Sequence, residues 1–233
     1  MKNLFSVFLL SLVLIACNDT KKQETVTEEI DIASLTSEEE VAWKIAEASG
    51  IENWDKVEEL AFTFNVDRGQ DHMARSWTWK PKTGDITMKN PEDMVEYNRT
   101  KMDSLATTTD KGFINDSFWL LAPYHLVWDK ESTSLTIQDT ATAPMSKELL
   151  SKITIVYGDE GGYTPGDAYD FYYDKDYMVK EWIFRRGNAD SWSMVTSCED
   201  YKNFEGLQIA ETHNTEGDMV KLYFTGIEVK TAE

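Results

Sequence analysis

The chain has 233 residues, and 42 Asp and Glu residues against 23 Lys and Arg residues give it a formal net charge of −19 at pH 7. Contacts to nucleic-acid phosphates need clustered Lys and Arg, so a chain this acidic is not expected to bind nucleic acid. The acidic excess keeps a protein soluble but does not specify its fold. The length suits a single domain preceded by an N-terminal segment.

The N-terminal segment has the pattern of an export signal. Lys2 precedes an apolar run from Leu4 to Ala16, which is shorter than the ~17–25 residues of a membrane-spanning helix. The sequence Leu-Ile-Ala-Cys ending at Cys17 resembles the lipobox of bacterial lipoproteins, in which the cysteine receives a diacylglyceryl thioether and becomes the new N-terminus. We therefore predict a lipoprotein signal peptide over residues 1–16 and lipidation of Cys17. A plain secretory signal with a cysteine nearby is the alternative.

Lipidation places the protein in the cell envelope, anchored to a membrane that we expect to be the outer membrane, facing either the periplasm or the exterior. Residues 17–35 are polar and free of aromatic residues, which predicts a flexible tether before a single domain over residues 36–233. With Cys17 consumed by lipid, Cys198 has no partner for a disulfide. Its alternation with Trp192, Met194 and Thr196 predicts a buried, unreactive thiol.

The first predicted element of the domain is a helix over residues 37–49. Ser37 and Glu40 have the spacing of a capping box, and Gly50 suits the left-handed residue that ends a helix. Alternating apolar residues then predict strands. These cover residues 60–66, 72–79, 86–88, 93–99, 134–138, 153–157, 168–173, 178–186, 191–200, 207–215 and 219–229, with a hairpin turn at residues 81–85.

The middle of the chain, residues 103–128, lacks strand alternation. Within it, Asn115 to Trp128 has the pattern of a capped helix that is apolar on all sides and interrupted by Pro123. The strands on either side are close in sequence, which favours an antiparallel meander. The predicted fold class is α+β: a large curved antiparallel sheet, forming an incomplete β-barrel, with an N-terminal helix and an inserted apolar helical segment.

No motif assigns a catalytic residue, a metal site or a cofactor. The three histidines, His72, His125 and His213, form no cluster with metal-ligand spacing, and His125 is expected to be a hydrogen-bonded core residue. The sequence has neither the Gly-x-Ser-x-Gly turn of serine hydrolases nor a phosphate-binding glycine pattern. Paired carboxylates for glycoside hydrolysis stay open, because their separation is spatial and does not follow from sequence spacing.

Aromatic residues are the surplus in this composition. Along residues 178–186, Trp182 and Phe184 share one face while Ile183 lies on the other, so apolar and polar faces do not separate cleanly. One explanation is a sheet covered on both sides, or a barrel with a second core. The other is a concave face that binds an apolar ligand, with residues 118–128 as a plug or lid. The candidate ligand-binding residues are Trp77, Trp79, Phe118, Trp119, Trp182 and Phe184.

The order of elements, together with the lipobox, resembles the half-barrel proteins of the LolA/LolB-like lipoprotein carrier and receptor type. The stretches 113–124 and 162–169 also resemble segments of lipoproteins from Bacteroidota. The resemblance implies an incomplete barrel whose apolar interior shelters lipid, and it assigns no catalytic residue. Because the carrier is a soluble shuttle whereas this chain carries an anchor signal, the resemblance favours a receptor-like or unrelated lipid-binding role.

We therefore predict a lipid-anchored extracytoplasmic binding protein, not an enzyme, that holds an acyl chain or other apolar small molecule and acts in envelope lipid or lipoprotein handling. One alternative is an envelope glycan or lipid hydrolase with two carboxylates roughly 5–9.5 Å apart. Another is a structural or interaction lipoprotein with a filled core. The expected partners are a membrane, through the N-terminal lipid, and an apolar small molecule.

Overall fold

The computed structural model describes residues 34–160, 165–218 and 220–232. By their internal contacts, residues Ile32–Glu233 form one unit. The predicted signal peptide, Cys17 and the tether up to residue 33 lie outside the described residues, so lipidation and anchoring stay predictions. None of the helices that the structure describes is long and apolar enough to cross a membrane.

The first helix, α1 (Ser37–Ala48), begins with a capping box one residue earlier than predicted. The Thr36 hydroxyl accepts a hydrogen bond from the Glu39 N–H at 3.2 Å, and the Glu39 carboxylate accepts one from the Thr36 N–H at 2.8 Å. The predicted pair of Ser37 and Glu40 is wrong. Both pairs have the required spacing, but Ser37 is already the first helical residue and its hydroxyl donates to Glu38 instead.

The end of α1 is confirmed at Gly50, which follows the C-cap Ser49 and has φ +89°. A Cβ on Gly50 would lie 2.0 Å from the carbonyl oxygen of Gly206, in the turn between two C-terminal strands. A short 3₁₀ helix, η2 (Ile51–Lys56), then leads into the first strand. Gly50 therefore permits both the left-handed turn and the close approach of the helix end to the sheet.

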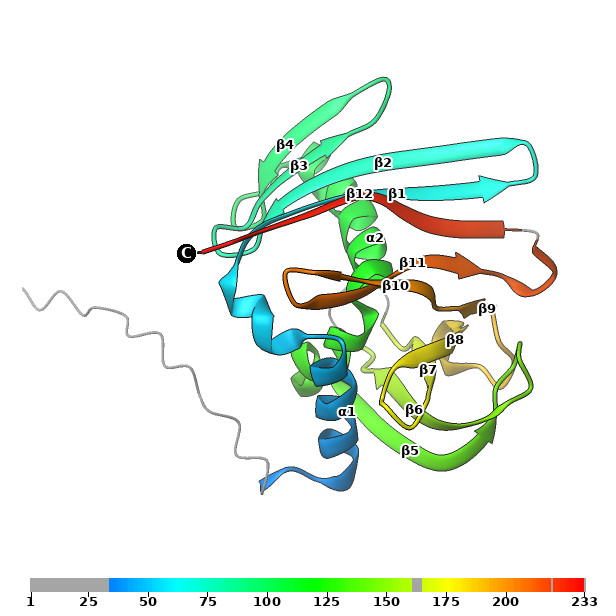
Figure 1. The fold of residues 1–233 in the computed structure, drawn as a ribbon. Helices are drawn as coiled ribbons and strands as arrows, with labels where there is room; N and C mark the ends of the chain where they lie inside the picture. Colours follow the sequence, from blue (N-terminus) through cyan, green and yellow to red (C-terminus); the bar gives the residue numbers. More distant parts are fainter. Residues whose placement is uncertain (1–33, 161–164, 219, 233) are drawn as a thin grey trace, which may run out of the picture. The chain divides into compact units, whose positions relative to one another are not determined.

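The first sheet has seven antiparallel strands in the order β10–β11–β12–β1–β2–β3–β4, so the first and last strands of the chain lie side by side (Figure 1). Its strands are β1 (Val57–Arg68), β2 (Asp71–Lys80), β3 (Asp85–Lys89), β4 (Met94–Asn98), β10 (Glu199–Phe204), β11 (Leu207–Asn214) and β12 (Val220–Thr231). The predicted alternation is confirmed in β1, where Leu60, Phe62 and Phe64 are buried in one apolar cluster.

The second sheet has five antiparallel strands in chain order: β5 (Thr133–Thr142), β6 (Leu149–Tyr157), β7 (Ala168–Tyr173), β8 (Val179–Arg185) and β9 (Met194–Ser197). The single strand predicted over residues 191–200 is two strands, β9 and β10, one in each sheet on either side of Cys198. An isolated bridge between Thr196 and Thr215 connects the sheets. The described strands do not close into a barrel, so the predicted α+β incomplete barrel is confirmed, with its strands divided between two sheets.

The second helix, α2 (Ser104–Trp128), is kinked at Leu121, which has φ −122° and ψ 27°, two residues before Pro123. It begins well before the predicted Asn115, with the Asp103 carboxylate accepting a hydrogen bond from the Ala106 N–H at 2.8 Å. Three consecutive threonines, residues 107–109, are weak helix formers and obscure this start in the sequence. Side chains of α2 belong to the apolar clusters on both sheets, so the helix packs between them.

The five-stranded sheet is covered on its outer face as well. Every residue of β7 is buried. The Glu181 carboxylate accepts hydrogen bonds from the backbone N–H groups of Met145, at 2.6 Å, and Ser146, at 2.8 Å, and holds their segment against the sheet. A small second core lies beneath this segment (Ala143, Tyr172, Ile183 and Val195). It accounts for the two-sided apolar pattern of β8, one of the two explanations that the sequence left open.

Substitution of Gly50 by alanine is expected to destabilise the protein by more than about 2 kcal/mol, because the left-handed conformation alone costs alanine ~1–2 kcal/mol. The overlap with Gly206 adds to that cost. The control is Gly69→Ala, since Gly69 has φ +61° but nothing within 4 Å of the added Cβ. Urea unfolding of the two variants measures the difference, and equal losses would contradict a close approach at Gly50.

Candidate functional site

A groove of about 890 Å³ opens between the two sheets, beside α2. Strands β1, β2 and β12 supply one wall, β7, β8 and β9 supply the opposite wall, and α2 supplies the side between them. The volume lies near the upper end of the ~300–1,000 Å³ range of small-molecule sites. The apolar lining residues are Phe64, Val66, Met73, Ile114, Phe118, Trp119, Tyr169, Trp182, Phe184, Met194, Val220 and Leu222.

Aromatic rings from α2, β7 and β8 form a continuous wall. The ring of Phe118 lies 4.7 Å from that of Tyr169 and 5.7 Å from that of Trp182, measured between centroids. Tyr169 in turn stacks on Trp182 at 5.6 Å and on Phe184 at 5.2 Å. These offset arrangements suit aromatic quadrupoles and hold the rings in place. The wall is therefore a preformed apolar surface on this side of the groove.

The orientation of α2 depends on two fully buried carboxylates. Asp116 accepts hydrogen bonds from Arg75 Nε at 2.8 Å, from Arg75 Nη2 at 2.6 Å and from Trp77 Nε1 at 2.8 Å. Asp110 accepts one from the Tyr97 hydroxyl at 2.9 Å and forms an ion pair with Arg99. These contacts join α2 to β2 and to the β4 hairpin, and they turn Phe118 and Trp119 toward the five-stranded sheet.

Four of the six aromatic residues predicted to bind ligand line the groove: Phe118, Trp119, Trp182 and Phe184. Trp77 and Trp79 do not line it. Both rings contact Phe113, at 5.5 Å and 5.3 Å, and Trp77 is only 2% exposed. Because α2 begins at Ser104 and not at Asn115, its first half contains Phe113. The Phe113 ring covers Trp77 and Trp79, which the sequence had placed on a ligand-binding face.

Several lining residues were not singled out from the sequence. Val66 and Phe64 lie on the inward face of β1, and Val220 and Leu222 lie on β12. Their alternation indicates an inward face, but it does not separate the part of that face that packs in the core from the part that borders the groove. The polar lining residues carry no local signal either, because they are spread over several elements that are far apart in the sequence.

The groove differs from the rest of the protein in charge. Arg68, Arg75, Lys111 and Arg186 line it, whereas Asp167 is the single carboxylate among the described lining residues. The whole chain has 42 acidic and 23 basic residues, so this local balance is the reverse of the overall one. Asp167 accepts a hydrogen bond from the Gly187 N–H at 2.7 Å, and Arg75 is paired with Asp116.

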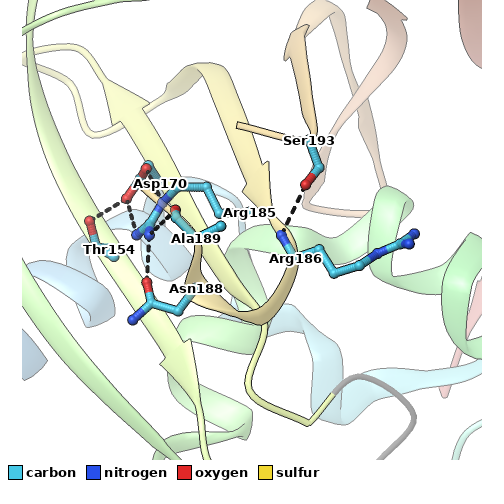
Figure 2. Close-up of polar contacts among 7 residues, drawn as sticks. All are labelled: Thr154, Asp170, Arg185, Arg186, Asn188, Ala189 and Ser193. Carbon is cyan, nitrogen blue, oxygen red and sulfur yellow. Dashed lines mark hydrogen bonds and ion pairs between the residues drawn. The ribbon is translucent and has the colours of Figure 1, made fainter. Parts of the chain in front are cut away.

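Two adjacent arginines at the end of β8, Arg185 within the strand and Arg186 directly after it, have different roles (Figure 2). The Arg185 guanidinium turns back to Asp170, with Nε to Oδ2 at 3.0 Å, and the Asp170 carboxylate also accepts from the Thr154 hydroxyl at 2.5 Å. The Arg186 side chain extends the other way. Its hydrogen bonds within the described residues are made by its backbone, whose N–H donates to the Ser193 hydroxyl at 3.1 Å and whose carbonyl accepts from the Ala189 N–H at 3.3 Å. Arg185 is thus structural, while Arg186 presents its charge to the groove.

His213 is buried where the two sheets meet. Its Nδ1 lies 2.9 Å from the Ser197 carbonyl oxygen, so this nitrogen carries the proton, and within the described residues Nε2 has no hydrogen-bond partner. Its ring lies 5.4 Å from that of Trp119. Burial lowers the pKa of His213 from 6.5 to about 4, which keeps the imidazole neutral at neutral pH.

Cys198, between β9 and β10, is a free cysteine, as the sequence predicted. Burial of its sulfur raises the pKa of the thiol to about 12. A thiolate is the reactive form of cysteine, so this side chain is not poised as a nucleophile. It borders a small enclosed space of about 20 Å³ together with His213 and Trp182.

The arrangement of carboxylates bears on the hydrolase alternative. Paired carboxylates roughly 5–9.5 Å apart across a cleft are its geometric requirement. The described lining of the groove contains Asp167 alone, whose oxygen already accepts a backbone hydrogen bond. Within the part of the chain that the structure describes, no group of three or more His, Cys, Asp or Glu side chains is placed to hold a metal ion. His125 is hydrogen-bonded, as expected, with Nδ1 2.8 Å from Asp129 Oδ2.

No protein-family model matches the chain, and no curated protein matches its sequence. Among solved structures, a DUF1329 family protein from Desulfovibrio piger is similar with a TM-score of 0.50 and 9% identity, covering 85% of this chain and 95% of that chain. A LolA superfamily protein from Nitrosomonas europaea is similar with a TM-score of 0.48 and 7% identity, covering 82% and 94%. At 9% identity the likeness to the first of these structures concerns the fold alone.

The free energy of unfolding is expected to fall by about 3 kcal/mol between about pH 6.5 and about pH 4 because of His213. The pKa of His213 is lowered in the folded state, so below pH 6.5 the unfolded chain takes up a proton that the folded chain refuses until about pH 4. Urea unfolding at several pH values measures this slope. His213→Gln should flatten it; parallel slopes for the parent protein and this variant would contradict the assignment.

The Cys198 thiol is expected to be inert in the folded protein because its pKa is raised by burial. In a Cys17→Ser background, Ellman's reagent at about pH 8 should titrate no thiol without denaturant and one thiol in guanidinium chloride. Rapid labelling of the folded protein would show that the sulfur is accessible.

Proposed function

We propose that this protein binds an apolar or amphiphilic small molecule in the groove between its two sheets, as a lipid-handling protein of the cell envelope anchored through Cys17. The observation that carries this proposal is a groove of about 890 Å³ with aromatic and aliphatic residues on all of its walls. Burial of an acyl chain there yields roughly 25 cal/mol per Å² of apolar surface removed from water. The preformed aromatic wall reduces the ordering cost of binding.

Binding is favoured over catalysis by the composition of the groove. Its described lining has one carboxylate, and the neutral His213 lies outside it, so neither a carboxylate pair nor an acid–base couple faces the ligand space. A filled interior is the remaining alternative. The outer face of the five-stranded sheet is filled in this way, whereas the inner face borders the groove.

The direct experiment uses the Cys17→Ser protein, purified without detergent. Organic extraction and mass spectrometry should recover a co-purified lipid, and the neutral fluorescent probe N-phenyl-1-naphthylamine should bind and be displaced by lysophospholipid. A protein that yields no lipid and does not enhance probe fluorescence would refute the proposal.

A matched pair of double variants localises binding to the groove. Met73→Gln/Met194→Gln places two amides in the lining and should weaken probe binding by about thirtyfold, because each lost apolar contact of this size costs ~1 kcal/mol. Met94→Gln/Met102→Gln makes the same chemical change at two exposed methionines outside the groove. It should bind the probe like the parent protein. Equal weakening in both variants would place the binding site elsewhere.

A further inference from the structure

The arginines of this protein divide into two groups. The chain has five, and three of them pair with enclosed aspartates: Arg75 with Asp116, Arg99 with Asp110 and Arg185 with Asp170. The other two, Arg68 and Arg186, both line the groove. Within the described residues, no hydrogen bond or ion pair is found for either of these two guanidinium groups.

A third cation, Lys111, lines the same groove, and its ammonium group likewise has no partner among the described side chains. The three cations come from separate elements. Arg68 is the last residue of β1, Lys111 stands in α2, and Arg186 directly follows β8. All three are exposed, so each side chain can extend along the apolar wall and present its charge at the edge of the groove.

Three unpaired cations around one apolar groove are unexpected in a chain with a net charge of −19. The overall field of such a protein repels anions, so an anionic ligand needs a local positive site. Arginine guanidinium groups match phosphate oxygens in two-point hydrogen bonds, and lysine adds a compact positive charge. The same groove offers aromatic and aliphatic surface to a chain attached to that phosphate.

We infer that the ligand is an anionic phospholipid, whose phosphoryl headgroup is bound by Arg68, Lys111 and Arg186 while its acyl chain lies against the wall of Phe118, Tyr169 and Trp182. This inference rests on the proposed function and adds the chemistry of the headgroup. Arg75 belongs to the support of the site, because its guanidinium is already held by Asp116. Phosphate without an acyl chain lacks the apolar contacts and binds weakly.

The experiment measures displacement of N-phenyl-1-naphthylamine from the full-length Cys17→Ser protein by two lysophospholipids of the same acyl length. Lysophosphatidylglycerol carries a net negative headgroup and lysophosphatidylcholine carries a neutral one. The anionic lipid is expected to compete at least about tenfold more strongly, because both headgroups carry a phosphate but the choline ammonium of the second lipid is repelled by the same three cations. Inorganic phosphate, the third competitor, is expected not to displace the probe.

The variant Arg68→Gln/Lys111→Gln/Arg186→Gln should abolish the preference for the anionic lipid, while the zwitterionic lipid still displaces the probe through its acyl chain. Its matched control, Lys89→Gln/Lys101→Gln/Lys130→Gln, removes the same charge at exposed lysines outside the groove. It should keep the preference. Binding of the zwitterionic lipid also reports that the triple variant is folded.

Salt dependence supplies an independent readout. If the three cations hold the headgroup, added NaCl should weaken binding of the anionic lipid, because salt screens the attraction. If only the net charge of the protein acts, salt should strengthen binding by screening repulsion. Equal competition by the two lipids, an equal effect of both triple variants, or strengthening by salt would overturn the headgroup assignment and leave the groove itself intact. Failure of every lipid to displace the probe would instead overturn the proposed function.

Discussion

The buried ion pair between Asp116 of α2 and Arg75 of β2 is the contact on which the rest of the structure depends. The Asp116 carboxylate is fully enclosed, and four side-chain N–H groups at 2.6 to 2.9 Å satisfy it: two of Arg75, one of Trp77 and one of Asn115. A buried charge of this kind contributes little net stability while it is paired, but loss of one partner costs roughly 3–5 kcal/mol. The pair therefore fixes the rotation of α2 about its axis against the seven-stranded sheet.

That rotation decides what the groove is made of. With Asp116 turned toward β2, Phe118 and Trp119 lie on the side of α2 that packs against the five-stranded sheet. Phe113, one turn earlier, covers Trp77 and Trp79. One helix therefore completes the core over one sheet and leaves a ligand-sized space beside the other. The same ion pair neutralises Arg75, so the positive character of the groove comes from cations on the surrounding elements.

The strands were predictable because apolar and polar residues alternate along a half-buried strand, and this alternation can be read from neighbouring residues. The interruption of α2 near Pro123, a kink at Leu121 in the structure, was predictable as well, because a proline disturbs a helix locally. The start of α2 was not predictable, because threonines 107–109 have weak helix propensity and the buried contacts of Asp110 with Tyr97 and Arg99 hold this part of the helix from other elements. The division of residues 191–200 between two sheets was also hidden, since only the bridge from Thr196 to Thr215 shows where one sheet gives way to the other.

By itself, the sequence determined which segments alternate between apolar and polar residues and that the first helix ends at Gly50. It also determined that aromatic residues gather on inward faces and that Cys198 has no partner within the domain. These are properties of neighbouring residues, and spacing along the chain expresses them. Only the tertiary structure decided which aromatic rings border a groove and which fill the core, because that depends on how α2 is turned between the sheets. It also decided that Arg68, Lys111 and Arg186, far apart in the sequence, surround one apolar space, since their proximity follows from sheet pairing and helix packing.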